Sequence, residues 1–461
     1  MSAARAPSLG LISLGCAKNL VDSEHMAGVL RAAGFGFAPV PEAADILLVN
    51  TCGFVRDAQE ESIAAILDAC ARKRRGACRA VVVTGCLAQR YRGELAAELP
   101  EVDAFVGLDG LERIATVLRQ VARGAHGILD VGGPARRLFE PRRPRVLLTG
   151  GPYAYLKIAE GCNHRCGFCA IPAIRGRQRS RPVRRIVQEA EHLLANGVRE
   201  LNLVAQDTTA YGHDRADGAD LAGLLQALGR IGGRFWIRVL YGYPTRVSDR
   251  LLAVMGEVAQ VCRYLDVPIQ HSHPAMLRRM RRADTIAAVA DLAARVRARL
   301  PGVALRTTCL VGHPGETPAE FRALLAYLQA AEFDHVGVFV FSPEAGTPAA
   351  RLPGAVPLRT ARARRVRVLQ VQRAIVARRT RELVGKDAEL LLESRDLGRP
   401  RRGVGRACRQ APEVDGVVHL TGLHPEPAVG GFVWARYTAA AGYDLRAQVL
   451  AAARPTGREG P

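Results

Sequence analysis

Lysine is almost absent from this chain, which has four of them, at positions 18, 73, 157 and 386. Arginine therefore carries nearly all of the positive charge, and the formal net charge is +21. An excess of this size favours an anionic partner such as nucleic acid or a ribonucleoprotein. A preference for arginine also arises in GC-rich genomes, so the charge by itself does not establish such a partner.

The chain also lacks long hydrophobic runs, since no stretch of 18 consecutive apolar residues occurs in it. A membrane-spanning helix needs about that length, so we expect no membrane partner. Residues Met1 to Leu14 lack the charged start, apolar core and cleavage site of a secretory signal. Both absences favour a cytoplasmic protein. In such a protein, eleven cysteines indicate metal or redox chemistry rather than disulfides.

The most informative cysteines are Cys162, Cys166 and Cys169, which have the spacing CxxxCxxC. Three thiols this close can converge on one face of a tight loop, and thiolates are the usual ligands of iron–sulfur clusters. Three ligands are one short of the four that complete a cubane, so one iron stays open. A structural zinc site is the alternative, but His164 lies inside the loop and not at the usual ligand spacing.

The residues around this loop carry a family resemblance. An apolar strand at 155–159 runs into the cysteines, a basic turn at 171–177 follows them, and a helix begins near Pro182. This arrangement resembles the radical S-adenosylmethionine (SAM) enzymes. The resemblance implies a 4Fe-4S cluster whose open iron binds SAM and whose electron cleaves SAM to a 5'-deoxyadenosyl radical.

Three further cysteines stand at equivalent places in the first 130 residues. Cys16, Cys52 and Cys86 each follow an apolar run, and a helical pattern comes after each of them. Alternating strands and helices predict a parallel sheet, in which ligands bind beyond the carboxyl ends of the strands. Isolated cysteines are often small core residues, but three at matching strand ends favour a second three-cysteine cluster. The expected strands are 9–14, 45–49 and 80–83, and the expected helices are 21–33, 57–72 and 92–99. We expect the remaining five cysteines not to be ligands: Cys70, Cys78, Cys262, Cys309 and Cys408.

The sequence around the amino-terminal cysteines narrows the resemblance. The segments SLGCAKNLVDSE from Ser13, NTCGF from Asn50 and TGCLAQRY from Thr84 are similar to the amino-terminal domain of the methylthiotransferases, a branch of the radical SAM superfamily. That family usually has proline where Ala17 stands. The difference leaves the three expected ligands intact.

Six apolar runs alternate with helical patterns in the central part of the chain. Six units are too few for a complete eight-stranded barrel and match the partial (β/α)6 barrel that the resemblance implies. Gln206, Gln270 and Glu316 follow three of the runs and are candidate contacts in a SAM or substrate pocket, although ordinary loop chemistry explains any one of them. His313 replaces the phenylalanine usual in this family. The expected strands are 153–159, 201–205, 235–240, 264–267, 303–311 and 335–341, and the expected helices are 183–195, 221–230, 247–259, 275–300 and 318–331.

The four residues after the second of these strands distinguish two branches of the family. They read QDTT from Gln206, which resembles the branch that methylthiolates an aspartate of small-subunit ribosomal protein S-twelve. The branch that acts on isopentenyladenosine in tRNA typically reads QNVN.

The resemblance also implies a mechanism and partners. Two 4Fe-4S clusters and two SAM molecules are expected: one SAM supplies the methyl group, and the other supplies the radical that abstracts a hydrogen from the aspartate β-carbon. A saturated carbon has no acidic proton, so general-base catalysis cannot replace the radical. The implied partners are ribosomal protein S-twelve, free or in the small subunit, and an electron donor such as a flavodoxin or ferredoxin.

The segment from Arg351 to Arg381 contains ten arginines and no acidic residue. Its apolar residues fit an amphipathic helix, and a contact to ribosomal RNA explains its charge as well as a solvated helix face does. These apolar residues are Val366, Leu369, Val371, Ile375 and Val376.

The last segment predicts a small OB-like barrel, because five short strands are expected at 388–392, 403–407, 417–421, 432–437 and 443–449. The turn PEVDG from Pro412 looks like the signature turn of a TRAM domain. Between Leu383 and Val449, nine basic residues against eight acidic ones leave a net charge of +1. That charge is small for RNA binding and favours docking to a basic ribosomal protein.

The predicted fold is therefore α/β. An amino-terminal open parallel α/β domain (1–130), a Gly-, Pro- and Arg-rich linker (125–150), a central partial barrel (150–382) and a small β-barrel (383–450) follow one another. The predicted function is methylthiolation of an aspartate β-carbon in ribosomal protein S-twelve. Two alternatives stay open: methylthiolation of isopentenyladenosine in tRNA, and a non-catalytic iron–sulfur protein that binds RNA or assists ribosome assembly.

Overall fold

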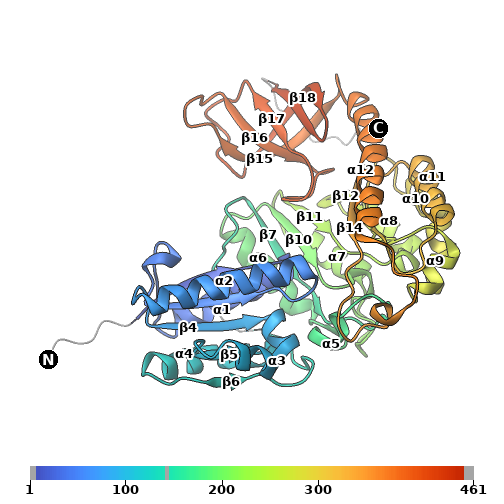
Figure 1. The fold of residues 1–461 in the computed structure, drawn as a ribbon. Coiled ribbons are helices and arrows are strands. Elements are labelled where there is room, and N and C mark those ends of the chain that lie inside the picture. The colour runs from blue at the N-terminus through green and yellow to red at the C-terminus, as the bar shows by residue number, and fades with distance from the viewer. Residues whose placement is uncertain (1–6, 141–144, 451–461) are drawn as a thin grey trace.

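The computed structural model describes residues 7–140 and 145–450. A parallel sheet, an open barrel and a small closed barrel follow one another along the chain (Figure 1). Residues 141–144 of the predicted linker and the first six residues lie outside the described ranges. No helix within those ranges combines the length and the apolar character needed to cross a membrane.

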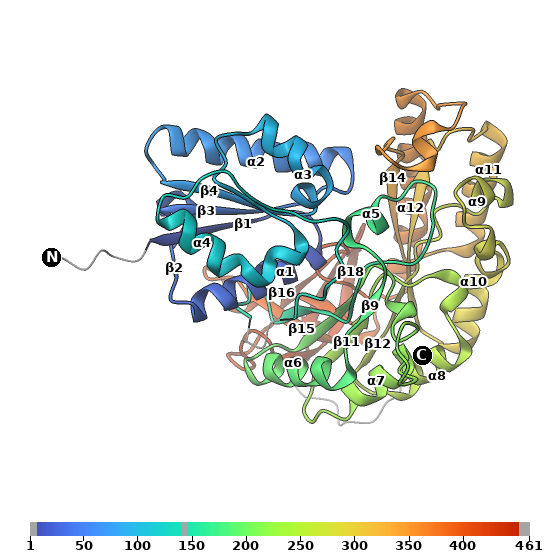
Figure 2. The same ribbon diagram turned by 90° about the horizontal axis from the view of Figure 1, so that it is seen from below.

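The amino-terminal part is a six-stranded parallel sheet in the order β2-β1-β3-β4-β5-β6. Helices α1 and α4 cover one face and α2 and α3 the other (Figure 2), because successive strand residues point to opposite faces. Leu48 belongs to the core shared with Met26 of α1, whereas Val49 belongs to the core shared with Ile66 of α2. The elements are β1 (Ser8–Ser13), α1 (Ala17–Ala32), β2 (Gly36–Phe37), β3 (Ile46–Thr51), α2 (Arg56–Arg74), β4 (Ala80–Gly85), α3 (Cys86–Glu98), β5 (Ala104–Val106), α4 (Ile114–Ala122) and β6 (Ile128–Asp130).

The central part is an open parallel barrel in the order β14-β13-β12-β11-β10-β7, which confirms the six-strand prediction. Helices lie outside it, and the apolar core between them and the strands is continuous. The strands are β7 (Tyr153–Lys157), β10 (Glu200–Val204), β11 (Trp236–Val239), β12 (Val261–Asp266), β13 (Ala304–Val311) and β14 (His335–Val340), with a small hairpin of β8 (Ala159–Glu160) and β9 (Arg179–Ser180). The helices are α5 (Ile171–Arg175), α6 (Val183–Ala195), α7 (Leu221–Gly229), α8 (Asp249–Glu257), α9 (Pro274–Arg279), α10 (Ile286–Arg299), α11 (Pro318–Ala331) and α12 (Leu358–Arg381).

The carboxy-terminal part is a closed five-stranded barrel, as predicted. The turn at 412–416 enters the amino-terminal end of the open barrel: Glu413 accepts hydrogen bonds from Tyr153 and Tyr155, and Asp415 accepts one from Tyr264. The closed barrel therefore seals the end of the open barrel that lies away from the cysteines. Its strands are β15 (Asp387–Arg395), β16 (Arg402–Ala407), β17 (Val418–Thr421), β18 (Phe432–Ala441) and β19 (Asp444–Val449).

The structure corrects several predicted elements. Helix α3 begins at Cys86 and not at residue 92, because its first turns are buried on all sides and show no polar face; Arg92 then interrupts it with a φ of 41°. The predicted helix 275–300 is divided into α9 and α10, with Arg281 at a φ of 56° between them. The basic turn after the central cysteines contains helix α5, and the predicted linker contributes strand β6 to the sheet.

Candidate iron–sulfur and SAM site

The three amino-terminal cysteines lie at one edge of the sheet. Strands β1, β3 and β4 are neighbours, with Ser13 opposite Asn50 and Asn50 opposite Thr84. Because the strands are parallel and in register, the residues that follow them meet at the same edge. Cys16 caps the start of α1, Cys52 follows β3 directly, and Cys86 is the first residue of α3. Helix N-termini favour negative charge, which suits a thiolate ligand at Cys16 and Cys86.

Two glycines let these three turns approach one another. Gly15 has a φ of 86°, and a Cβ at that position would lie 2.9 Å from the Cys52 sulfur. Gly85 has a φ of 96°, and a Cβ there would lie 2.4 Å from Asn50 Oδ1. The Ser62 hydroxyl of α2 then holds the Cys52 backbone, because it accepts from the Cys52 N–H at 3.0 Å and donates to the Cys52 carbonyl at 2.9 Å.

The central cysteine loop is held mainly by backbone hydrogen bonds. The Cys162 N–H donates to the carbonyl of Gly176 at 3.1 Å, and the Gly167 N–H donates to that of Met280 at 2.9 Å. The second bond explains the division of the predicted helix 275–300, since the loop after α9 packs on the cysteines. It also brings the Arg282 guanidinium within 3.6 Å of the Cys166 sulfur.

Asp207, one of the residues that distinguish the two branches, supports the same loop. Its carboxylate lies 2.7 Å from Nε2 of His164 and accepts a hydrogen bond from the Thr209 hydroxyl at 2.6 Å. The His164 ring stacks on Tyr243, with ring centroids 3.7 Å apart. Asp207 is buried, so in this structure it positions the cysteine loop and does not lie open to a substrate.

The three predicted pocket residues lie beyond the carboxyl ends of barrel strands, as expected, but two of them are already bound by protein groups. Gln206 donates to Glu160 at 2.9 Å. Glu316 accepts from Arg364 of α12 at 2.6 Å and lies 3.5 Å from His271. Gln270 has a φ of 68° and bridges to β13 through its backbone. A direct contact of these side chains with SAM therefore stays a prediction.

Several side chains cross the boundary between the sheet and the open barrel near the two cysteine sites. Figure 2 shows α5, which follows the central cysteines, lying between these two parts. Arg175 at the end of α5 donates to the sulfur of Cys86 at 3.2 Å. Arg90 of α3 binds Glu344 in the loop after β14 at 2.7 Å, and Lys18 lies 3.5 Å from the centre of the Tyr241 ring.

Each site offers three cysteine thiols, which is the number of protein ligands that leaves one iron of a cubane cluster open. The residues that the structure describes contain no group of three side chains that converge on a single metal ion. A cubane cluster does not require such a group, because each cysteine binds a different iron of the cluster. Burial raises the pKa of the Cys86 and Cys169 thiols to about 12 and that of Cys162 to about 11. Cluster binding at these positions must therefore displace protons.

Cys16 is electrostatically different from the other cysteines of the two sites. Although the residue is exposed, the surrounding protein partly desolvates its thiol and so raises its pKa. The positive charges of Lys18 and Arg175, together with the backbone N–H groups of residues 18 and 19, outweigh this effect and lower the pKa overall. The five cysteines expected not to be ligands lie within or against apolar cores.

Sequence reasoning missed the side chains that hold the two sites, namely Arg175, Arg282, His164 and Asp207. The position of Arg175 could have been noticed in the sequence, because a basic residue in the short turn after the cysteine motif is available to contact a ligand. Arg282 had none, since 116 residues separate it from Cys166.

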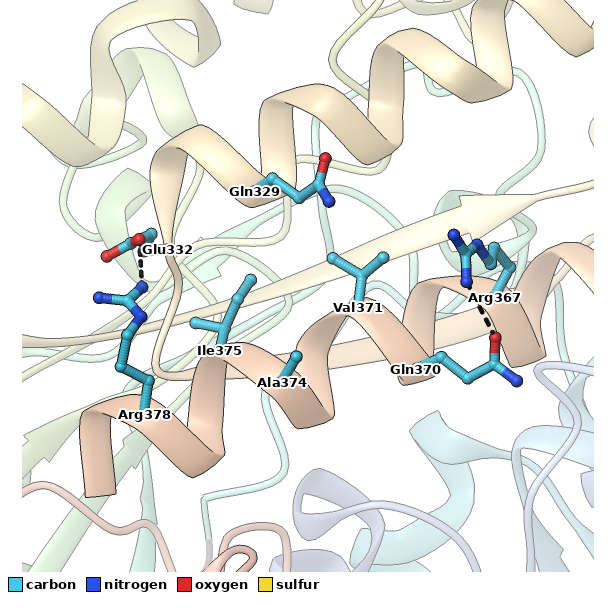
Figure 3. Close-up of a pocket in the computed structure, with 8 residues that line it drawn as sticks. All are labelled: Gln329, Glu332, Arg367, Gln370, Val371, Ala374, Ile375 and Arg378. Carbon is cyan, nitrogen blue, oxygen red and sulfur yellow. Dashed lines mark hydrogen bonds and ion pairs between the residues drawn. The ribbon is translucent and has the colours of Figure 1, made fainter. Parts of the chain in front are cut away.

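The arginine-rich segment forms α12, which packs on β14 and α11. Val371 and Ile375 face inward as predicted, but Val366 is 53% exposed and does not belong to the apolar face. A groove of about 420 Å³ lies between α11 and α12. Figure 3 shows Val371 and Ile375 lying between Arg367 and Arg378 along α12. Arg378 is paired with Glu332. Among the described residues, six exposed arginines of this helix have no acidic partner: Arg359, Arg362, Arg365, Arg367, Arg373 and Arg381.

Models of known families match three parts of the chain. The Radical SAM superfamily matches residues 156–328, the TRAM domain matches residues 384–450, and the family described as Uncharacterized protein family UPF0004 matches residues 8–107. The central match covers all three cysteines of the CxxxCxxC loop. The amino-terminal match covers the other three.

Individual proteins resemble the chain over nearly its whole length. It is 46% identical over 448 residues to the ribosomal protein uS12 methylthiotransferase RimO of Syntrophus aciditrophicus, which covers 97% of this chain and 99% of that protein. It is 43% identical over 450 residues to the protein of the same name from Trichlorobacter lovleyi, covering 98% and 100%.

Solved structures resemble the fold at low sequence identity. The radical SAM methyltransferase TsrM of Kitasatospora setae, with cobalamin and a [4Fe-4S] cluster bound, has a TM-score of 0.56 at 17% identity and covers 75% of this chain and 77% of that chain. The cobalamin-dependent radical SAM enzyme OxsB has a TM-score of 0.52 at 11% identity, covering 75% and 55%. At these identities the similarity concerns the fold alone.

Proposed function

The chain belongs to the RimO family of ribosomal protein uS12 methylthiotransferases, and we propose that it adds a methylthio group to the β-carbon of an aspartate in uS12, which is ribosomal protein S-twelve. The observation that carries the proposal is the identity of 46% over 97% of this chain. Membership in the radical SAM superfamily implies SAM and a 4Fe-4S cluster. A second 4Fe-4S cluster and a second SAM belong to the proposal.

In this proposal Cys162, Cys166 and Cys169 hold the cluster that binds SAM. When bound, that cluster supplies an open iron for SAM and the electron that generates the radical. The second cluster is held by the three cysteines at the edge of the sheet, Cys16, Cys52 and Cys86. Gln206, Gln270 and Glu316 are the proposed pocket residues at the barrel rim.

The fold supports radical chemistry because it limits access of water to the barrel. An apolar cluster inside the barrel joins Val21 of α1, Tyr155 of β7 and Leu391 of β15. The turn with Glu413 and Asp415 closes the opposite end. A reactive carbon radical is quenched by unwanted donors, so a shielded site protects the reaction.

Intact-mass spectrometry of uS12 tests the proposal. We expect uS12 from cells with the gene to be heavier by one methylthio group than uS12 from cells that lack it. Complementation with Cys162→Ala should leave uS12 unmodified, which controls for effects of the protein that need no radical. Equal masses with and without the gene would refute the uS12 assignment, and methylthiolated adenosine in tRNA would then identify the other branch.

We include a ribosomal RNA contact by α12 in the proposal, since its unpaired arginines lie on its exposed face and are free to bind phosphates. The double variant R362Q/R373Q should bind small ribosomal subunits more weakly and with a smaller salt dependence. Arg137→Gln, on an exposed arginine already paired with Glu112, is the matched control. Unchanged salt dependence in the double variant would remove the RNA contact from the proposal.

The structure weakens the argument that the closed barrel docks to a basic protein. Asp415 has a fully buried side chain paired with Arg306, and Glu393 pairs with the buried Arg406. These carboxylates neutralise internal arginines and are not available to a partner. The partners that stay in the proposal are uS12, free or in the small subunit, and an electron donor such as a flavodoxin or ferredoxin.

A further inference from the structure

Arg175 is the residue that connects the two cysteine sites. It ends α5, six residues after Cys169, and its side chain is 2% exposed. From there the guanidinium crosses to the amino-terminal site, where Nε donates to the sulfur of Cys86 at 3.2 Å. A residue of the central loop is thus in direct contact with an expected ligand of the other cluster.

The guanidinium is held in this orientation by three other groups. Nη1 donates to Asp22 at 3.0 Å and to Glu160 at 2.8 Å, and Nη2 donates to Asn19 at 3.2 Å. Asp22 and Asn19 lie on α1, directly after Cys16, whereas Glu160 lies two residues before Cys162. The contacts of this one side chain therefore join segments that flank ligands of both sites.

The surrounding charges are balanced. Lys157 of β7 also binds both acids, with a hydrogen bond to Asp22 and one to Glu160 at 2.7 Å. Two cations and two anions alternate in a buried cluster, so the cluster fixes the geometry without adding net charge. Within the described part of the chain, Lys157 contacts no sulfur, whereas Arg175 contacts that of Cys86. Only the planar, forked guanidinium can bind all four partners at once.

We propose that Arg175 is a positioning residue for the amino-terminal cluster, which it ties to the central loop through a hydrogen bond to the Cys86 thiolate. This rests on the proposed two-cluster function. A cationic donor at a ligand sulfur stabilises the reduced, more negative state of a cluster and thereby raises its reduction potential. Arg282 has the corresponding place at the central site, 3.6 Å from the Cys166 sulfur.

The test is a redox titration, followed by electron paramagnetic resonance, of full-length protein reconstituted with both clusters. In Arg175→Lys, which keeps the charge but loses the Nε donor, we expect the potential of the amino-terminal cluster to become more negative while that of the central cluster stays unchanged. Arg282→Lys is the matched control and should shift only the central cluster. In Arg175→Lys, methylthiolation of uS12 should fall about tenfold or more, while SAM cleavage persists.

An unchanged amino-terminal potential in Arg175→Lys, with only a lower melting temperature, would overturn the inference and leave Arg175 as a clamp between two parts of the fold. If this variant does not fold, protein with native Arg175, labelled with ¹⁵N-arginine and lacking the three central cysteines, answers the same question. A ¹⁵N coupling to the remaining cluster supports the hydrogen bond, and its absence overturns it. Wild-type protein that binds only one cluster would instead refute the two-cluster proposal, so the two failures are distinguishable.

Discussion

The two cysteine sites of this protein are built in opposite ways. The central site has its three proposed ligands within eight consecutive residues, and its loop is held mainly by backbone hydrogen bonds. The amino-terminal site has its proposed ligands at the ends of three strands, and it depends on the register of the sheet and on two glycines. A local loop can be recognised from its spacing, whereas a dispersed site exists only once the sheet has formed.

Each site therefore needs a different kind of interaction. The central site should tolerate changes of surrounding side chains better than the amino-terminal site does, because backbone groups do most of the anchoring. The dispersed site should fail when a single turn can no longer approach its neighbours. Three predictions test this contrast, and a fourth tests the stability of the barrel beside it.

The largest expected effect is loss of a ligand. Cys162→Ala should abolish both SAM cleavage and methylthiolation, whereas Cys86→Ala should abolish methylthiolation and leave SAM cleavage intact, because each cysteine serves its own cluster. Iron per chain and 5'-deoxyadenosine are the quantities to measure. Cys408→Ala, at a cysteine expected not to be a ligand, should keep both values. Loss of SAM cleavage in Cys86→Ala would show that the sites are not separable.

The next largest effect is expected from glycine. Gly85→Ala places a Cβ 2.4 Å from Asn50 Oδ1 at a φ of 96° and should destabilise the sheet by roughly 3–5 kcal/mol. We expect iron to be lost from the amino-terminal site. Gly167→Ala in the central loop meets nothing closer than 3.5 Å and should keep its iron. Iron content and thermal unfolding are measured for both variants. Equal iron loss in the two would contradict the difference expected between the two sites.

A smaller effect concerns the barrel, where Asp266 ends β12. Burial raises its pKa from 3.8 to about 6, and Arg306 offsets only part of this effect. The folded state therefore binds the proton more tightly, so the contribution to stability is complete below about pH 3.8 and is lost as the pH rises through about 6.

Asp266→Asn keeps an acceptor for the Tyr241 N–H but cannot ionise. We expect it to melt at a higher temperature than the wild type at pH 8, by the equivalent of about 3 kcal/mol at most. The difference in melting temperature between the variant and the wild type should become smaller as the pH falls from 8 to 5. A difference that does not change with pH would exclude ionisation of Asp266 as its cause.

The smallest effect is expected at Ser62, whose hydroxyl makes two hydrogen bonds with the Cys52 backbone. Ser62→Ala should cost about 1–2 kcal/mol and weaken iron binding at the amino-terminal site only. Ser248→Ala removes the cap of α8 at a similar cost of about 1 kcal/mol and serves as the control, since it lies far from that site in the chain. Iron loss of equal size in the two variants would mean that general destabilisation explains it.

Much of the fold was predictable because the periodic patterns of apolar residues indicate where strands and helices lie. The strands around Cys16, Cys52 and Cys86, the six barrel strands and the five strands of the closed barrel were predicted within a few residues of their bounds. The start of α3 was not, because its first turn is buried on all sides. The division between α9 and α10 was not either, because it results from docking on the central cysteine loop.

The sequence by itself determined the kind of chemistry, since the CxxxCxxC spacing and the strand-end cysteines are local features that can be recognised from the order of the residues alone. Only the tertiary structure decided how the two sites are connected. Arg175 is separated by 89 residues from Cys86 and by 153 from Asp22, and no local pattern links such positions. Their contact follows from the packing of α5 against the edge of the sheet, which is a property of the folded chain.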